Sequence, residues 1–194
     1  MVQFFASMEQ TTLIALLFIS WSFYFLLRRE PRHYWSSKLD GLIPIIPVFV
    51  IPYLALFPFV IASFLLLVYS PFATEFFLSV FIANTAAAFF WFFIPTGMHR
   101  PNISGPGFLK RCISWVYRHD GPANVFPSSH VFSAVICGYY LALAYPVHSL
   151  LVWAVTVSIA LSTVFVKQHY LVDILGGVMC ATGAIGMAYL FLSF

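Results

Sequence analysis

Long apolar stretches, separated by short polar segments, follow one another along most of this 194-residue chain. A helix needs about 20 mostly apolar residues to cross a hydrocarbon layer of roughly 30 Å. The pattern predicts six membrane-spanning helices and an all-α membrane helix bundle in which residues 1–194 form a single domain. We place the spans at residues 11–27, 43–69, 73–95, 129–145, 149–167 and 171–193.

The second apolar stretch, residues 43–69, contains Pro44, Pro47, Pro52 and Pro58. Proline lacks the backbone N–H and clashes with the preceding helical turn. We therefore expect this span to be bent or broken, which a bundle tolerates where neighbouring groups satisfy the freed carbonyls.

Composition supports a membrane location. Hydrophobic residues make up 62% of the chain and charged residues 8%, and the mean hydropathy is +0.95. The hydrophobic fraction and the mean hydropathy exceed those of ordinary soluble domains and the charged fraction is far lower, so we expect an integral membrane protein. Cys112, Cys137 and Cys180 are odd in number and widely spaced, which predicts neither a disulfide framework nor a zinc site.

The longest connection, residues 96–128, is rich in glycine and proline, and a loop of this length is typical of a functional segment. Between residues 108 and 118 it carries apolar side chains on one helical face and Lys, Arg and Ser on the other. This periodicity predicts an interfacial helix at 108–118, lying at headgroup depth. The alternative is an irregular loop with accidental periodicity.

In the six-span layout, all nine Lys and Arg residues lie on the membrane face that carries the long loop. The opposite face has only Glu9 and Glu75. Under the positive-inside rule, the basic face would be cytoplasmic. A cationic rim would also attract an anionic headgroup, and the two interpretations are compatible.

Polar and ionisable side chains from three separate segments reach that same face, because even-numbered spans begin where odd-numbered spans end. Ionisable groups at the ends of membrane spans usually mark a functional site. They are Arg100 after the third span, Ser128, Ser129 and His130 at the start of the fourth, and Lys167, His169 and Asp173 between the fifth and the sixth.

The residue types at these positions suggest chemistry at phosphorus. His169 and Asp173 are spaced i and i+4, so on a helix the carboxylate would orient one ring nitrogen and leave the other as a nucleophile. A purely structural His–Asp hydrogen bond is the alternative. Ser128 and Ser129 fit simple helix capping, and the same helix start offers free N–H groups to an anion.

The arrangement resembles the type 2 phosphatidic acid phosphatase superfamily, whose pattern is K-x6-R-P, then P-S-G-H, then S-R-x5-H-x3-D on a six-helix bundle. By this resemblance His169 forms a phosphohistidine, Asp173 orients it, and His130 protonates the leaving oxygen. Arg100 matches the family's arginine, whose guanidinium suits phosphate oxygens, and at the start of the fourth span the hydroxyls of Ser128 and Ser129 would be further donors to phosphate.

The sequence departs from the family pattern at three positions. Phe93 replaces the lysine, Ser129 replaces the glycine, and Thr163 stands where the second arginine is expected. Lys167, four residues after Thr163, would share its helical face and could supply one lost charge. The run 167–173 also resembles a divergent branch that includes inositol phosphorylceramide synthases and sphingomyelin-synthase-like transferases.

The resemblance implies a lipid phosphatase that hydrolyses a phosphomonoester or diphosphate of an amphiphile in the bilayer. Two alternatives stay open: a lipid headgroup phosphotransferase and a non-catalytic membrane protein. We expect no metal, no cofactor and no nucleic-acid partner. The family usually places its site outside the cytoplasm or in an organelle lumen, which the Lys and Arg distribution contradicts.

Overall fold

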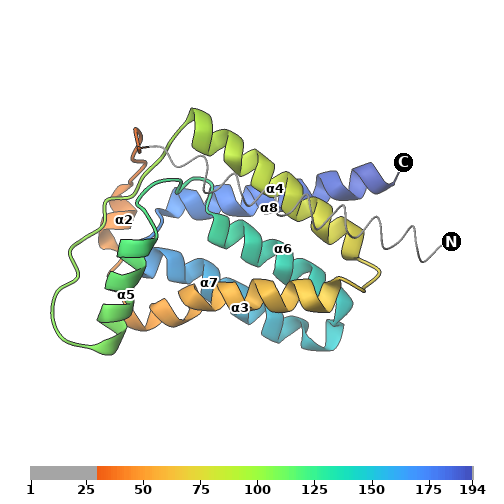
Figure 1. The fold of residues 1–194 in the computed structure, drawn as a ribbon, viewed down its shortest axis with the longest axis horizontal. Coiled ribbons are helices and arrows are strands. Elements are labelled where there is room, and N and C mark those ends of the chain that lie inside the picture. Colours follow the sequence, from red (N-terminus) through yellow and green to blue (C-terminus); the bar gives the residue numbers. More distant parts are fainter. Residues whose placement is uncertain (1–29, 194) are drawn as a thin grey trace.

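The computed structural model describes residues 30–193, which fold into a bundle of α-helices (Figure 1). Extended pairing among these residues is limited to two isolated bridges, His33 with Thr96 and Gly97 with Ala123. The first predicted span, 11–27, lies outside the described residues. The elements are α2 (Lys38–Leu42), η1 (Pro47–Phe49), α3 (Val50–Leu67), α4 (Ala73–Phe93), α5 (Phe108–His119), α6 (Ser129–Ala144), η2 (Pro146–His148), α7 (Ser149–Phe165) and α8 (Leu171–Leu192).

Four helical segments are long and apolar enough to cross a membrane, so the prediction of an all-α integral membrane protein is confirmed. They are Pro47–Leu67, Ala73–Phe93, Pro146–Phe165 and Leu171–Leu192. Helix α6 is also apolar but has 16 residues, a length of about 24 Å at 1.5 Å per residue. Four of the five predicted spans beyond residue 30 therefore contain a helix of membrane-spanning length, and the span at 129–145 contains the shorter α6.

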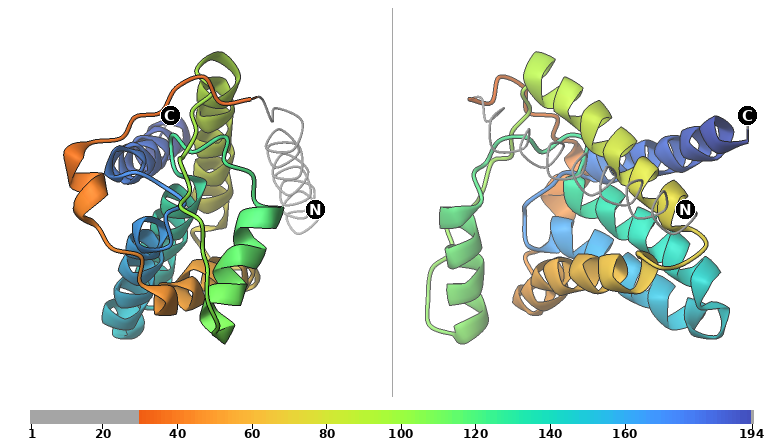
Figure 2. Two further views of the ribbon diagram at one scale, coloured as in Figure 1. Left: turned by 90° about the vertical axis from the view of Figure 1, so that its left-hand side faces the viewer. Right: turned by 45° about the vertical axis from the view of Figure 1, so that its right-hand side comes forward.

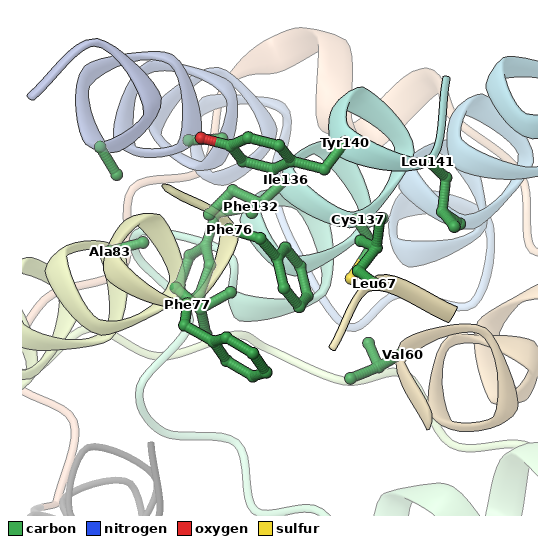
Figure 3. Close-up of a cluster of buried hydrophobic side chains, with 14 of the residues drawn as sticks. Val60, Leu67, Phe76, Phe77, Ala83, Phe132, Ile136, Cys137, Tyr140 and Leu141 are labelled. Atoms are coloured by element: carbon green, nitrogen blue, oxygen red, sulfur yellow. The ribbon is translucent and has the colours of Figure 1, made fainter. Parts of the chain in front are cut away.

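Helix α6 lies at the centre of the bundle and packs against α3, α4, α7 and α8 (Figures 1 and 2). Figure 3 shows Phe76 and Phe77 of α4 beside Phe132 of α6, all three fully buried. The outward faces of α3, α7 and α8 carry large apolar side chains such as Leu65 and Leu150, which are exposed. Helices that are apolar on all sides suit a lipid environment.

The proline-rich second stretch is broken near its start, as predicted. Residues 43–46 are not helical, η1 begins at Pro47, and α3 then continues through Pro58. The backbone N–H of Ile46 donates to the Phe165 carbonyl at the end of α7, at 3.1 Å. This hydrogen bond connects the segment before α3 to the end of α7.

The predicted amphipathic helix in the long loop is present as α5, one residue longer than expected. It crosses the end of the bundle at a steep angle to the other helices (Figures 1 and 2). Its buried Ile113 and Val116 pack against Val50 and Tyr53 of α3. The apolar periodicity therefore reflects real packing, and α5 covers one end of α3.

Candidate active site

Two histidines meet at the end of the bundle that carries α5. His130 belongs to the first turn of α6, and His169 to the connection between α7 and α8. Their ring centroids are 6.2 Å apart with an interplanar angle of 56°. Both residues are buried, at 8% and 7% exposure. Within residues 30–193, Nε2 of His130 is buried and has no hydrogen-bond partner.

Asp173 lies directly behind His169. Its Oδ2 is 3.5 Å from Nδ1 of His169 and accepts a hydrogen bond from the Tyr170 backbone N–H at 2.8 Å. The expectation that His169 and Asp173 share a helix is wrong, because α8 begins at Leu171. The capping turn before α8 produces the pairing instead. Because the carboxylate faces Nδ1, the other ring nitrogen of His169 is left for chemistry.

The turn that carries His169 is held by backbone hydrogen bonds to the end of α7. The N–H groups of Gln168 and His169 both donate to the Thr163 carbonyl, at 2.9 and 3.2 Å. Lys167 adopts a left-handed conformation, with φ of 53°. Since α7 ends at Phe165, Lys167 does not continue the helical face of Thr163, which corrects that expectation. Its Nζ donates to the Asp40 carbonyl at 2.7 Å.

Asp40 is a structural anchor that the sequence analysis did not identify. Its Oδ1 accepts from the N–H of Leu171, the first residue of α8, at 2.8 Å. Its Oδ2 accepts from the N–H and hydroxyl of Ser37 at 2.7 and 2.6 Å. Burial raises the pKa of the Asp40 carboxyl, but these hydrogen bonds outweigh it and leave the pKa below its usual value. The spacing of Ser37 and Asp40, a capping box, was the available signal.

Arg100 binds chain carbonyls at the end of α5. Its guanidinium donates to the carbonyls of Tyr117 at 3.1 Å and Gly121 at 2.7 Å, and to that of Asp120. It also donates to Oε1 of Gln168, beside His169. Cations are favoured at a helix C-terminus. Arg100 therefore connects the end of α5 to the turn that carries His169.

Tyr117 connects the same two segments. Its hydroxyl donates to the Val166 carbonyl at 2.8 Å, and its ring centroid is 5.0 Å from the Arg100 guanidinium carbon. Burial raises the pKa of Tyr117 to about 12, although the Arg100 charge opposes the shift. The hydroxyl therefore remains a hydrogen-bond donor throughout the physiological pH range.

Ser128 caps α6 and also joins it to α8. Its hydroxyl accepts from the Val131 N–H at 3.4 Å, and its own N–H donates to the Asp173 carbonyl at 3.2 Å. A Cβ added at Gly177 would lie 2.9 Å from the Ser128 carbonyl oxygen, closer than real Cβ atoms approach. Glycine at 177 thus permits the close contact that brings Asp173 and His169 beside His130.

Two aromatic side chains of α3 contact the imidazole of His130. The Tyr53 ring stacks on the imidazole at a centroid distance of 4.2 Å, and Phe57 meets it edge-on at 6.3 Å. The Tyr53 hydroxyl donates to Oδ2 of Asp120 at 2.9 Å. Neither Tyr53 nor Asp120 was predicted, because the sequence pattern does not show that the start of α3 meets the end of α5.

A cavity of about 340 Å³ opens beside His130, between α3 and α4, which spread apart from their shared loop (Figure 1). Helix α6 forms a third wall and α5 covers one end. The walls include Ser129, His130 and Asp120 but are otherwise mostly apolar. His169 lies outside the cavity lining. The structure thus brings together four of the predicted site residues, His130, His169, Asp173 and Ser128. The side chains of Arg100 and Lys167 donate hydrogen bonds to chain carbonyls nearby.

Comparison with known proteins identifies one family. The model described as the PAP2 superfamily matches residues 12–187, which include every element from α2 to α7 and the whole candidate site. No curated protein and no solved structure matches the chain. The match is to the superfamily and does not distinguish the branch that contains inositol phosphorylceramide synthases.

Proposed function

Because this chain belongs to the PAP2 superfamily, whose members have phosphatase-like, lipid-related functions, we propose that it is a lipid phosphatase. It would hydrolyse a phosphomonoester or diphosphate of an amphiphile through a phosphohistidine on His169. The observation that carries the proposal is the 6.2 Å separation of the His130 and His169 rings, with Asp173 behind His169.

The first step transfers the phosphoryl group to the protein. Asp173 holds the proton on Nδ1 of His169, so the lone pair of Nε2 attacks phosphorus. The bond from phosphorus to the lipid oxygen breaks, and His130 donates its proton to that oxygen. General acid catalysis of this kind typically contributes about 10² to 10⁴-fold in rate.

The second step releases phosphate. Water attacks the phosphohistidine, His130 takes a proton from that water, and the P–N bond breaks to regenerate His169. The cavity reaches His130 but not His169. Substrate must therefore widen the gap between the rings through a small movement of the turn at residues 166–170, as catalytic contacts often form fully only with substrate bound.

The N-terminus of α6 is the proposed phosphate-binding element. The first N–H groups of a helix have no intrahelical acceptor and favour anions, and the Ser129 hydroxyl lies at the same helix start. Ser128 is the N-cap residue of α6 and fixes the geometry of this helix start. Arg100 and Lys167 already donate hydrogen bonds to chain carbonyls around the His169 turn, so we propose that both mainly position this turn.

The proposed membrane arrangement has six spans, the described helices α3, α4, α6, α7 and α8 together with residues 11–27. Family resemblance places the site outside the cytoplasm or in a lumen, whereas the Lys and Arg distribution favours the cytoplasm. A cysteine introduced at Ser104, which is exposed in the long loop, tests the orientation. Labelling of Ser104→Cys in intact cells by a membrane-impermeant thiol reagent would support the extracytoplasmic arrangement, and protection would support the reverse.

Phosphate release by the purified full-length protein from lipid monophosphates and diphosphates in detergent tests the activity. We expect His169→Ala and His130→Ala to abolish release, and labelled phosphate to be trapped on His169 in the wild type. His148→Ala is the matched control, because His148 is exposed and lies in the turn between α6 and α7. Failure to release or trap phosphate with any lipid class would favour a non-catalytic protein.

Headgroup transfer to a second lipid is the other candidate, favoured by the mostly apolar cavity that reaches His130. A lipid hydroxyl lying there would attack the phosphohistidine in place of water. Labelled headgroup appearing on an added acceptor lipid, with little free phosphate, would identify the transferase.

A further inference from the structure

The buried side chain of Asn84 faces the cavity from the middle of α4. Asn84 is 6% exposed, and its Nδ2 donates to the Val80 carbonyl at 2.8 Å. Within residues 30–193, its Oδ1 makes no hydrogen bond, and the residue forms part of the cavity wall. Since Oδ1 is not one of the inaccessible, unpartnered atoms of this part of the chain, it is open to the cavity. A ligand that covered it without offering a hydrogen bond would incur a desolvation cost.

Ser133 lines the same cavity from α6, one turn beyond Ser129. Serine and threonine inside helices commonly donate to a carbonyl one turn back. In the described part of the chain, the Ser133 hydroxyl makes no such bond. Many other helical hydroxyls do make it, among them those of Ser63, Ser79, Thr156, Ser158 and Ser162.

Both polar groups line the cavity that would hold the chain of a bound amphiphile. With phosphate at His130 and the start of α6, Ser133 is about 6 Å further along the helix axis from Ser129. That distance corresponds to a few carbon atoms of a lipid. A purely hydrocarbon chain would bury Asn84 and Ser133 without partners, whereas a chain with a hydroxyl or amide there would satisfy them.

We infer that Asn84 and Ser133 form a polar subsite for a hydroxyl or amide N–H that the substrate carries within a few carbons of its phosphate. The inference rests on the proposed function and narrows its substrate class. The preferred substrates are phosphorylated amphiphiles with such a group next to the headgroup, and phosphorylated alcohols with wholly hydrocarbon chains are poorer ones.

Binding of uncharged probes tests the subsite without requiring catalysis. Two chain-brominated amphiphiles of equal length are compared, an N-acyl amino alcohol and a simple long-chain alcohol, by quenching of tryptophan fluorescence in the purified protein. Trp91 and Trp115 line the cavity and report occupancy. We expect the amide probe to bind about tenfold more tightly, since one satisfied buried hydrogen bond is worth about that factor.

Asn84→Leu should remove this preference, and Ser133→Ala should reduce it about threefold. Thr85→Val and Ser158→Ala are the matched controls, because both hydroxyls are exposed and donate to carbonyls of their own helices. Equal binding of the two probes by the wild type, or a preference that survives Asn84→Leu, would overturn the inference.

Phosphate release from the phosphorylated forms of the two probes tests the subsite and the proposed phosphatase activity independently. We expect the ratio of kcat/KM values to follow the binding preference and to collapse in Asn84→Leu. If the preference in binding is present but neither lipid releases phosphate, the subsite stands and the phosphatase proposal fails. If both lipids are hydrolysed with equal kcat/KM, the activity stands and the subsite is rejected.

Discussion

The close contact between α6 and α8 at Gly177 is the feature that most directly controls the candidate site. In Gly177→Ala, the new Cβ would lie 2.7 Å from Cβ of Val131 and 2.9 Å from the Ser128 carbonyl oxygen. Ordinary van der Waals contact begins at 3.4 Å, so about 0.7 Å of separation is missing at the nearest atom. Both neighbours belong to the rigid start of α6, so the helices must move apart.

That displacement acts on the catalytic geometry, because Asp173 lies one turn before Gly177 and His130 lies on the opposing helix. A misplacement of about 1 Å in an active site can cost on the order of 10²-fold in rate, and overpacking typically costs about 1–3 kcal/mol of stability. We expect Gly177→Ala to lower kcat for phosphate release about 10 to 100-fold and to lower Tm.

Gly183→Ala is the matched control within the same helix. Nothing lies within 4 Å of a Cβ added at Gly183, so alanine there gains helix propensity without a clash. We expect wild-type activity and an unchanged or higher Tm. Wild-type kcat in Gly177→Ala, measured beside this control, would refute the view that close approach of α6 and α8 sets the site.

Three further predictions follow from the contacts around His169. Asp173→Asn should lower kcat by about 10²-fold or more with less effect on KM, because the amide no longer favours the imidazole proton on Nδ1; steady-state kinetics check this. Asp40→Asn should lower Tm at neutral pH and make Tm depend less on pH in the acid range. The pKa of Asp40 is depressed in the folded state, so the stabilisation by its carboxylate is complete above the unfolded pKa and is lost as pH falls through the folded pKa. Thermal melts from about pH 7 to pH 3 measure this dependence. Phosphate release should survive chelators, and loss of activity in EDTA that Mg²⁺ or Zn²⁺ restores would contradict the metal-independent mechanism.

Local patterns in the sequence predicted the long helices and α5 but not the short helix α2. Apolar length predicted α4 and α8 closely, and amphipathic spacing predicted α5 within one residue. These signals work because helix hydrogen bonds are local and because a membrane requires long apolar segments. The alternation of spans across the bilayer also predicted that His130 and His169 would share one face, since that argument needs only the order of the spans.

Tertiary structure decided how the site is held. His169 and Asp173 lie side by side, with 3.5 Å between Nδ1 and Oδ2, but through a capping turn and not along one helix. Arg100 was expected to bind phosphate, yet its hydrogen bonds run to Gly121 and Gln168. Asp40 anchors the start of α8 from more than a hundred residues away in the sequence.

The amino-acid sequence by itself was enough to predict the membrane class and the long helices, and it named the side chains that we propose carry the chemistry. Tertiary structure alone decided which of those side chains line the cavity and which hold the backbone, and it placed Asn84 in the cavity wall. The physical reason is that a hydrogen-bonding group takes whichever partner packing brings within about 3 Å. Which partner comes within reach depends on the positions of several helices at once, and no periodic pattern in the sequence indicates it.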